Sequence, residues 1–124
     1  MGSFIEINDT LQITKEQGWP DELNLEKHLK APYNTEDFKN KIFEFKDKPK
    51  IRIYKLPPVR NFLVENRSGK WICWGLCLIT ELHHDNLKEM TSGKFKIIKI
   101  FTPEEMKQAE QITLSDKELR YFDR

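Results

Sequence analysis

Cationic and aromatic side chains gather in the middle of the chain, at a spacing that could bind a nucleic acid. Residues 50–55 alternate, so Arg52 and Tyr54 are expected on one face of a strand, and Lys55 and Arg60 follow closely. Cations bind phosphates and aromatic rings stack on bases, so this composition favours a nucleic-acid-binding surface. The alternative is an edge strand whose lysines prevent aggregation with other sheets.

Two tryptophans three positions apart, Trp71 and Trp74, also have two interpretations. Their indoles either fill the core, or one of them lines a pocket and stacks on a flat ligand such as a base. In the second interpretation they join the cations in one cleft. The candidate nucleic-acid-binding residues are therefore Arg52, Tyr54, Lys55, Arg60, Trp71 and Trp74.

Metal and acid–base chemistry find little support in the sequence. His83, His84 and Asp85 are the only compact cluster of metal-ligand types. Adjacent residues of an extended segment point in opposite directions, so the two histidines are not expected to hold one ion, and we predict no metal site. Glu65, Glu81 and His84 could act as acid or base, but their spacing pairs none of them, and the catalytic residues stay unknown.

The cysteines and glycines argue against several other chemistries. Cys73 and Cys77, placed on one predicted strand, are too far apart for a disulfide and are expected to be small buried hydrophobes. The five glycines are too scattered for a phosphate-binding loop or a dinucleotide turn, and there is no G-x-S-x-G nucleophile motif. We therefore expect no cofactor, and whether the protein is an enzyme stays open.

The 124 residues are typical of one domain, and their net charge of +1 hides a strong segregation. Residues 1–38 carry eight acidic and three basic side chains, whereas residues 39–60 carry eight basic and two acidic ones. Such segments could pair within one molecule or between two, which keeps a protein-interaction domain among the alternatives. No apolar run is long enough to span a bilayer and residues 1–4 lack the features of a secretory signal, so we expect a cytoplasmic protein without membrane contact.

Short strands and helices that would position these residues follow from apolar spacing and turn residues. The predicted strands are 4–7, 11–13, 42–45, 50–55, 62–65, 71–82 and 94–101, with turns at 47–49 and 66–69, a helix over 21–30 and a loop over 83–93. The first helix should place Leu25 and Leu29 on its inner face. Thr102, Pro103 and Glu105 form a capping box with proline at the first helical position, so a second helix begins there.

The predicted strand over 71–82 is apolar on both faces, so we expect it at the centre of the sheet. A strict alternation would place Trp71, Cys73, Cys77 and Ile79 on one face and Ile72, Trp74, Leu76, Leu78 and Leu82 on the other. Gly75 suits a bulge or a bend at a barrel corner. In the strand over 94–101 the apolar phase slips at Ile98, which indicates a second bulge.

The motifs of residues 42–110 occur in a recognisable order. They are Lys50-Ile51-Arg52-Ile53-Tyr54-Lys55-Leu56-Pro57-Pro58, Phe62-Leu63-Val64-Glu65, Gly69-Lys70-Trp71, Trp74-Gly75, Ser92-Gly93-Lys94-Phe95-Lys96-Ile97-Ile98 and Thr102-Pro103-Glu104-Glu105. Together they resemble small PUA-like barrels, in particular the ASCH and EVE groups. The resemblance implies a curved barrel of five or six strands with flanking helices, and a cleft for RNA or for a modified base in DNA or RNA.

Some ASCH proteins are small amidohydrolases that act on a modified nucleoside through a lysine, a threonine and a glutamate. This trio cannot be matched to the present sequence position by position, and residues 1–38 lie outside the part that resembles the family. The resemblance therefore implies a ligand class but no catalytic residues.

The sequence thus predicts one α+β domain over residues 1–124. Residues 1–38 supply strands and a short helix, 39–112 supply a curved, mostly antiparallel sheet that closes to a barrel with a capped helix, and 113–124 are a polar tail. The predicted function is nucleic-acid or modified-base binding, with RNA or DNA as the partner. A small amidohydrolase acting on a modified nucleoside and a protein-interaction domain are the alternatives, and the oligomeric state is left open.

Overall fold

The computed structural model describes residues 10–30 and 34–115, with side chains up to Ala109. Along the chain the elements are β1 (Thr10–Ile13), the 3₁₀ turn η2 (Lys15–Gln17), α1 (Leu25–Lys30), the 3₁₀ turn η3 (Thr35–Phe38), β2 (Ile42–Pro49), β3 (Asn61–Arg67), β4 (Lys70–Asp85), β5 (Met90–Ile100) and α2 (Pro103–Ser115). The predicted α+β class is confirmed. The predicted strand over 4–7 and the tail beyond Ser115 lie outside the described residues.

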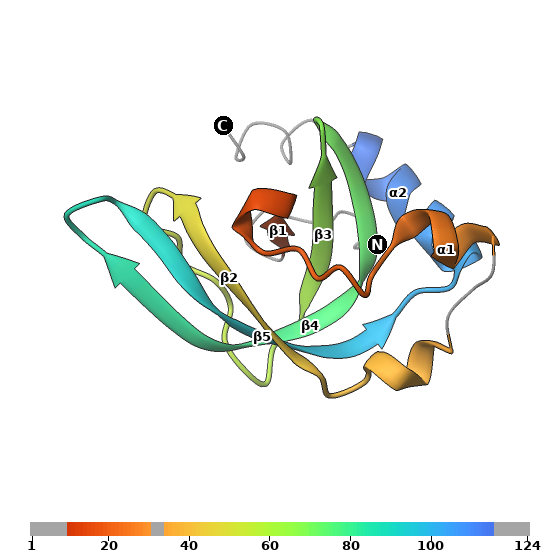
Figure 1. Ribbon diagram of the computed structural model, residues 1–124, viewed down its shortest axis with the longest axis horizontal. Helices are drawn as coiled ribbons and strands as arrows, with labels where there is room; N and C mark the ends of the chain where they lie inside the picture. The colour runs from red at the N-terminus through yellow and green to blue at the C-terminus, as the bar shows by residue number, and fades with distance from the viewer. Residues whose placement is uncertain (1–9, 31–33, 116–124) are drawn as a thin grey trace.

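The five strands form one curled sheet of order β1-β3-β4-β5-β2 (Figure 1). β1 runs parallel to β3, and the other neighbouring strands run antiparallel. β1 and β2 are therefore the two edges, and a side chain joins them where a closed barrel would have a ladder: the Lys48 ammonium donates to the carbonyl oxygen of Gln12. The sheet is curved and mostly antiparallel as expected, but it is a half-barrel: no ladder pairs β1 with β2 among the described residues, so the predicted closure to a barrel is not found.

Three bulges bend the central strands of this sheet. Two of them were predicted, and the third, at Thr80 of β4, was not. Trp74 is an extra residue of β4 in its register with β3, and Ile98 is an extra residue of β5 in its register with β4. The strands approach so closely at the bend that a Cβ on Gly75 would lie 1.9 Å from the carbonyl oxygen of Lys99. Glycine is therefore the only residue that fits there without moving a strand.

The bend also corrects the predicted faces of β4. The main core contains Ile72 and Trp74 before the bend but Cys77 and Ile79 after it. An inserted residue shifts the two-residue period by one, so a strict alternation cannot hold along the whole strand. A smaller cluster on the other face contains Val64, Trp71 and Cys73, with Ala109 of α2 packed against it.

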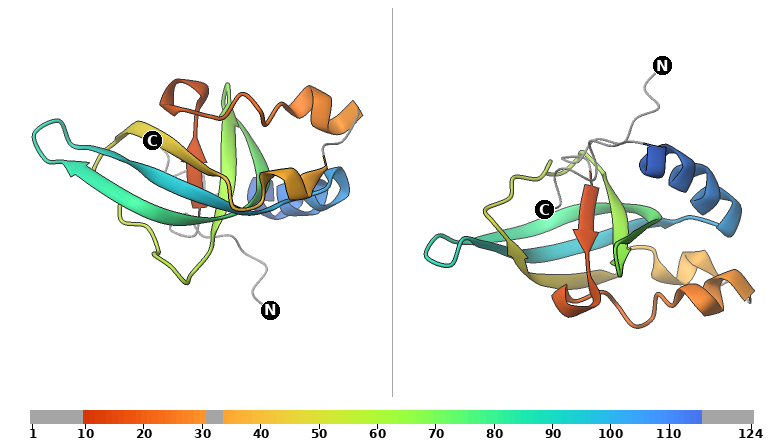
Figure 2. Two further views of the ribbon diagram at one scale, coloured as in Figure 1. Left: turned by 60° about the horizontal axis from the view of Figure 1, so that its bottom comes forward. Right: turned by 90° about the horizontal axis from the view of Figure 1, so that it is seen from above.

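α1 and α2 lie at the same end of the curled sheet, and the β4–β5 hairpin projects from the other end (Figures 1 and 2). This hairpin corrects the predicted loop over 83–93, because β4 continues to Asp85 and β5 starts at Met90. β2 likewise continues through the predicted turn at 47–49. These polar strand ends are largely exposed, so no apolar alternation marks them in the sequence.

Residues 50–60 leave the sheet, so the predicted strand over 50–55 is wrong. Lys50 has a φ of 72°, in the left-handed region. The Thr91 hydroxyl then accepts a hydrogen bond from the Arg52 N–H (2.8 Å) and donates one to the Lys50 carbonyl (2.9 Å). The Thr91 side chain thus forms the hydrogen bonds that these two backbone groups would form with a neighbouring strand in a ladder. Ile53 is 83% exposed, so the alternation seen in the sequence does not mark a buried face.

α2 begins as predicted. The Glu105 N–H donates to the Thr102 Oγ1 at 3.2 Å, and the Thr102 N–H donates to the Glu105 Oε1 at 3.0 Å. These two hydrogen bonds are the reciprocal pair of a capping box, and Pro103 occupies the first helical position.

α1 is shorter than predicted, and its buried face is different. Asn24 Oδ1 accepts from the Lys27 N–H at 3.1 Å, so the helix starts four residues after Asp21. His28 is fully buried, whereas Leu29 is 53% exposed. The His28 Nε2 donates to the carbonyl oxygen of Phe101 at 2.9 Å, which satisfies a polar group inside the fold. The prediction is confirmed for Leu25, which packs against the main core, and is wrong for Leu29, because apolar spacing does not register a histidine bonded to a distant carbonyl.

Candidate functional site

The four candidate residues that lie within 50–60 do not share one surface in the structure. Tyr54 is 7% exposed and its ring packs edge-on against Phe45, with 6.2 Å between ring centroids. Arg52 is half-buried, and its Nε donates to the carbonyl of Pro49 at 3.1 Å. Arg52 and Tyr54 therefore do not share an exposed face, contrary to prediction, because this segment is not a strand.

Lys55 and Arg60 do have exposed side chains. The Lys55 carbonyl oxygen accepts from the Asn61 Nδ2 at 2.9 Å, which holds the end of this segment against the start of β3. A role for these two cations in nucleic-acid binding stays a prediction.

The tryptophans of β4 lie in the core. Trp74 has no exposed surface, Trp71 is buried, and the two rings lie in different apolar clusters on opposite faces of the strand, as their spacing of three predicts. Both indoles are therefore buried, whereas the cations Lys55 and Arg60 are exposed. The six candidates therefore do not form the cleft that the sequence predicts.

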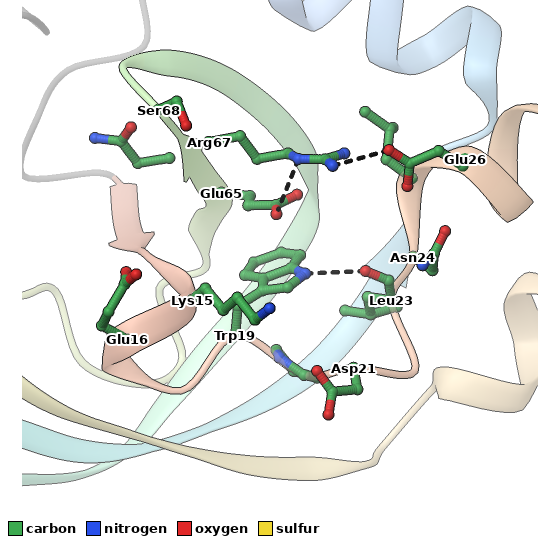
Figure 3. A pocket seen from close by; sticks show the side chains of 13 residues that line it. Lys15, Glu16, Trp19, Asp21, Leu23, Asn24, Glu26, Glu65, Arg67 and Ser68 are labelled. Atoms are coloured by element: carbon green, nitrogen blue, oxygen red, sulfur yellow. Dashed lines mark hydrogen bonds and ion pairs between the residues drawn. The ribbon is translucent and has the colours of Figure 1, made fainter.

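A different cleft opens where the end of β3 faces the segment between η2 and α1 (Figure 3). It has a volume of about 310 Å³. We call it the Glu65 cleft. It is lined by Lys15, Glu16, Trp19, Pro20, Asp21, Leu23, Asn24, Leu25, Glu26, Glu65, Asn66, Arg67 and Ser68.

Local sequence places one wall of this cleft. Thr14 and Gln17 cap η2 reciprocally, and Gly18 ends it with a φ of 107°. A Cβ on Gly18 would lie 2.8 Å from the carbonyl oxygen of Glu44, so glycine also lets the turn approach β2. The chain then continues into Trp19, whose Nε1 donates to the carbonyl oxygen of Leu23 at 2.9 Å. This hydrogen bond fixes the indole at the base of the cleft, where its ring belongs to the main core and 8% of its surface is exposed.

On the opposite wall of the cleft, the Glu65 carboxylate is bound by a second indole, that of Trp74. Glu65 is 8% exposed, and its Oε1 accepts from the Trp74 Nε1 at 2.9 Å. The Trp74 ring in turn packs on the Trp19 ring, with 5.5 Å between centroids. Trp74 thus acts from inside the core, because it orients the Glu65 carboxylate and supports the Trp19 ring.

Electrostatics set the state of this carboxylate. Burial raises the pKa of Glu65, while the Trp74 hydrogen bond and the nearby Arg67 charge oppose that rise. Arg67 lies 3.7 Å from Glu65 and 2.8 Å from Glu26, nitrogen to oxygen. The hydrogen bond from Arg67 holds the pKa of Glu26 below its usual value. One guanidinium therefore bridges a buried and an exposed carboxylate across the cleft (Figure 3).

The remaining lining is polar and acidic. Four carboxylates and two cations line the cleft, a net charge of −2 when all are ionised. Asn24 and Asn66 add amide groups that can both donate and accept. The arrangement suits a flat ligand that stacks near an indole and donates hydrogen bonds to a carboxylate.

The other reactive side chains stand apart from this cleft. The His83 Nε2 lies 3.2 Å from the Glu81 Oε1, and the His84 Nε2 donates to the Arg52 carbonyl at 3.0 Å, so the adjacent histidines bind different groups. Cys73 and Cys77 are buried and unbridged, as predicted, and burial raises the pKa of Cys73 to about 12. In the part of the chain that the structure describes, no three His, Cys, Asp or Glu side chains come together to hold a metal. Within the same ranges, no helix is long and apolar enough to cross a membrane.

From the sequence, Glu65 was noted only as an unpaired carboxylate, and Trp19 was not among the candidate residues. One signal was available: Glu65 and Arg67 are two positions apart on a strand and so share a face. The partner Trp74 depends on the bulged hairpin register, which the sequence does not show. Comparison with family models, with curated proteins and with solved structures finds no match to the chain.

Proposed function

We propose that this protein is a nucleic-acid-binding module that accepts an unpaired base in the Glu65 cleft. The observation that supports it best is the Glu65 carboxylate, buried and held by Trp74 and Arg67 beside the Trp19 indole. Single-stranded bases are bound by stacking on aromatic rings and by hydrogen bonds to their edges. A carboxylate accepts hydrogen bonds from the amino groups of those edges.

The sugar–phosphate backbone would stay outside the cleft, whose net charge is negative. Lys55 and Arg60 offer exposed cations near the start of β3. At about 3.3 Å per residue, Arg60 lies about 17 Å along the chain from Glu65. A single strand that places one base in the cleft must therefore extend beyond the cleft to meet these cations, which lie at the other end of the buried β3. A PUA-like assignment of the half-barrel is part of the same proposal.

Direct titration tests this function. Short single-stranded RNA and DNA of mixed sequence are titrated at low salt, and binding is followed by calorimetry. We expect single strands to bind more tightly than duplexes, because only an unpaired base can enter the cleft. Glu65→Gln should weaken binding about tenfold, the loss of one charge-assisted base contact. The matched control is Glu36→Gln, an exposed glutamate of η3 that does not line the cleft.

Salt dependence tests the role of the outer cations. Replacing Lys55 or Arg60 with glutamine should reduce the slope of log K against log salt by about one for each lost phosphate contact. Absence of binding to every strand at low salt would contradict the proposal.

Amide hydrolysis on a modified nucleoside is the second candidate, and one observation favours it. Lys15 and Glu65 line the same cleft, one from η2 and one from β3. A carboxyl whose pKa is raised by burial can donate a proton to a leaving amine. Incubation with nucleosides acylated on the exocyclic nitrogen tests this activity. Release of the free acid by the wild type, lost in Lys15→Met and Glu65→Gln, would establish it, and an unchanged acylated nucleoside would exclude it.

A further inference from the structure

We infer that the group which enters the Glu65 cleft carries a positive charge, as does a base methylated on a ring nitrogen. This inference rests on the proposed function only in assigning the ligand to the nucleosides. The charge preference itself follows from the lining of the cleft, and it can be tested with a cation that is not a nucleoside.

Charge is the first reason. Of the two cations in the lining, Arg67 is already engaged with Glu26 and Glu65 at 2.8 and 3.7 Å. These three groups alone leave one negative charge beside the ligand. Glu16 and Asp21 extend the lining and outweigh the single positive charge of Lys15. An anionic ligand would therefore be repelled from the cleft, while a cationic one would be attracted.

Burial strengthens this preference at one point. Glu65 is 8% exposed, so its interaction with a neighbouring charge is less screened than that of a surface carboxylate. A cation that reaches Glu65 would repay part of the desolvation that burial costs the carboxylate. A neutral base can offer hydrogen bonds but no such compensation.

The aromatic wall is the second reason. Indole is the side chain whose ring attracts cations most strongly, and the 8% of the Trp19 surface that is exposed lies at the base of this cleft. Trp74 and the Leu23 carbonyl hold that ring in place at 5.5 and 2.9 Å. An indole and carboxylates around one concave space are a combination that favours a flat cation over a neutral ring of the same size.

The test compares two isomers that differ in charge. 1-Methyladenosine is cationic near neutral pH, whereas N6-methyladenosine has the same added methyl group and is neutral. Both are titrated into the full chain at pH 7 and low salt, with adenosine as reference and tetramethylammonium as the cation that is not a nucleoside. We expect 1-methyladenosine to bind at least about tenfold more tightly than its isomer. The preference should shrink in Glu65→Gln and persist in the control Glu36→Gln.

The outcomes separate this inference from the proposed function. Equal affinity for the two isomers, or preference for the neutral one, overturns the charge inference but leaves base binding intact. Binding of tetramethylammonium alone, lost in Glu65→Gln, supports a cation site and contradicts a base site. If the cleft binds none of these probes and the chain binds no oligonucleotide, both the inference and the proposed function are wrong.

Discussion

The hydrogen bond from the Trp74 indole to Glu65 can be tested by replacing each partner in turn. Trp74→Phe keeps an aromatic ring in the core but removes the N–H that lies 2.9 Å from the carboxylate. Glu65→Gln keeps the shape of the acceptor but removes its charge. The double variant completes a cycle in which terms that do not depend on both residues cancel.

The magnitude follows from the burial of both partners. A hydrogen bond to a charged group contributes about 1.5–3 kcal/mol, and a neutral one contributes about 1 kcal/mol. The smaller ring also leaves empty space in the core, and we take the resulting loss in the free energy of unfolding as about 1 kcal/mol. Trp74→Phe should therefore lower the free energy of unfolding by about 2.5–4 kcal/mol in the wild type. In the Glu65→Gln background the loss should be about 2 kcal/mol.

Urea denaturation followed by far-ultraviolet circular dichroism measures all four proteins, because tryptophan fluorescence would itself change with the substitution. The expected coupling is about 0.5–2 kcal/mol. A coupling below about 0.3 kcal/mol would mean that Trp74 does not orient this carboxylate, since independent sites deviate from additivity by that amount. The geometric basis of the Glu65 cleft would then be wrong.

Three further results are expected. Burial raises the pKa of Glu65 above its ordinary 4.5. Between pH 4.5 and the raised pKa, the folded chain therefore binds more protons than the unfolded chain. The free energy of unfolding falls as pH rises through this range. Glu65→Gln should remove this decline in urea titrations between pH 4.5 and 7, and an unchanged decline would assign it to another group. Gly75→Ala should cost about 1–3 kcal/mol or more, because its Cβ would lie 1.9 Å from the Lys99 carbonyl oxygen, and a melting temperature within one degree of the wild type would contradict this. Cys73 and Cys77 should resist a thiol-specific reagent at pH 8 until the chain is unfolded in urea, because burial raises the pKa of both thiols; rapid labelling of the folded protein would refute it.

Features that depend on neighbours in sequence were predictable. The capping box at Thr102 and Glu105 needs only residues three positions apart, and both of its hydrogen bonds form. The bulges at Gly75 and Ile98 show as a glycine inside a strand and as a slip of the apolar phase. The buried thiols follow from their apolar neighbours on one strand.

Features that depend on packing were not predictable in the same way. Residues 50–55 alternate like a strand, yet the Thr91 hydroxyl takes their backbone groups and Tyr54 turns into the core. Alternation of apolar and polar residues indicates a period of two, but it does not show whether a neighbouring strand is present to form the hydrogen-bond ladder. The exposed cations Lys55 and Arg60 were thereby separated from the aromatic rings expected beside them.

By itself the sequence determined the α+β class, the bulged central strand and the start of α2, because local spacing encodes each of them. Only the tertiary structure decided where a ligand could bind. The Glu65 cleft joins residues 15–26 to residues 65–68, and its key contact joins Glu65 to Trp74 across a hairpin whose register a bulge has shifted. No pattern along the chain specifies a contact that depends on how two distant segments pack, so the binding site emerges only when the sheet has curled.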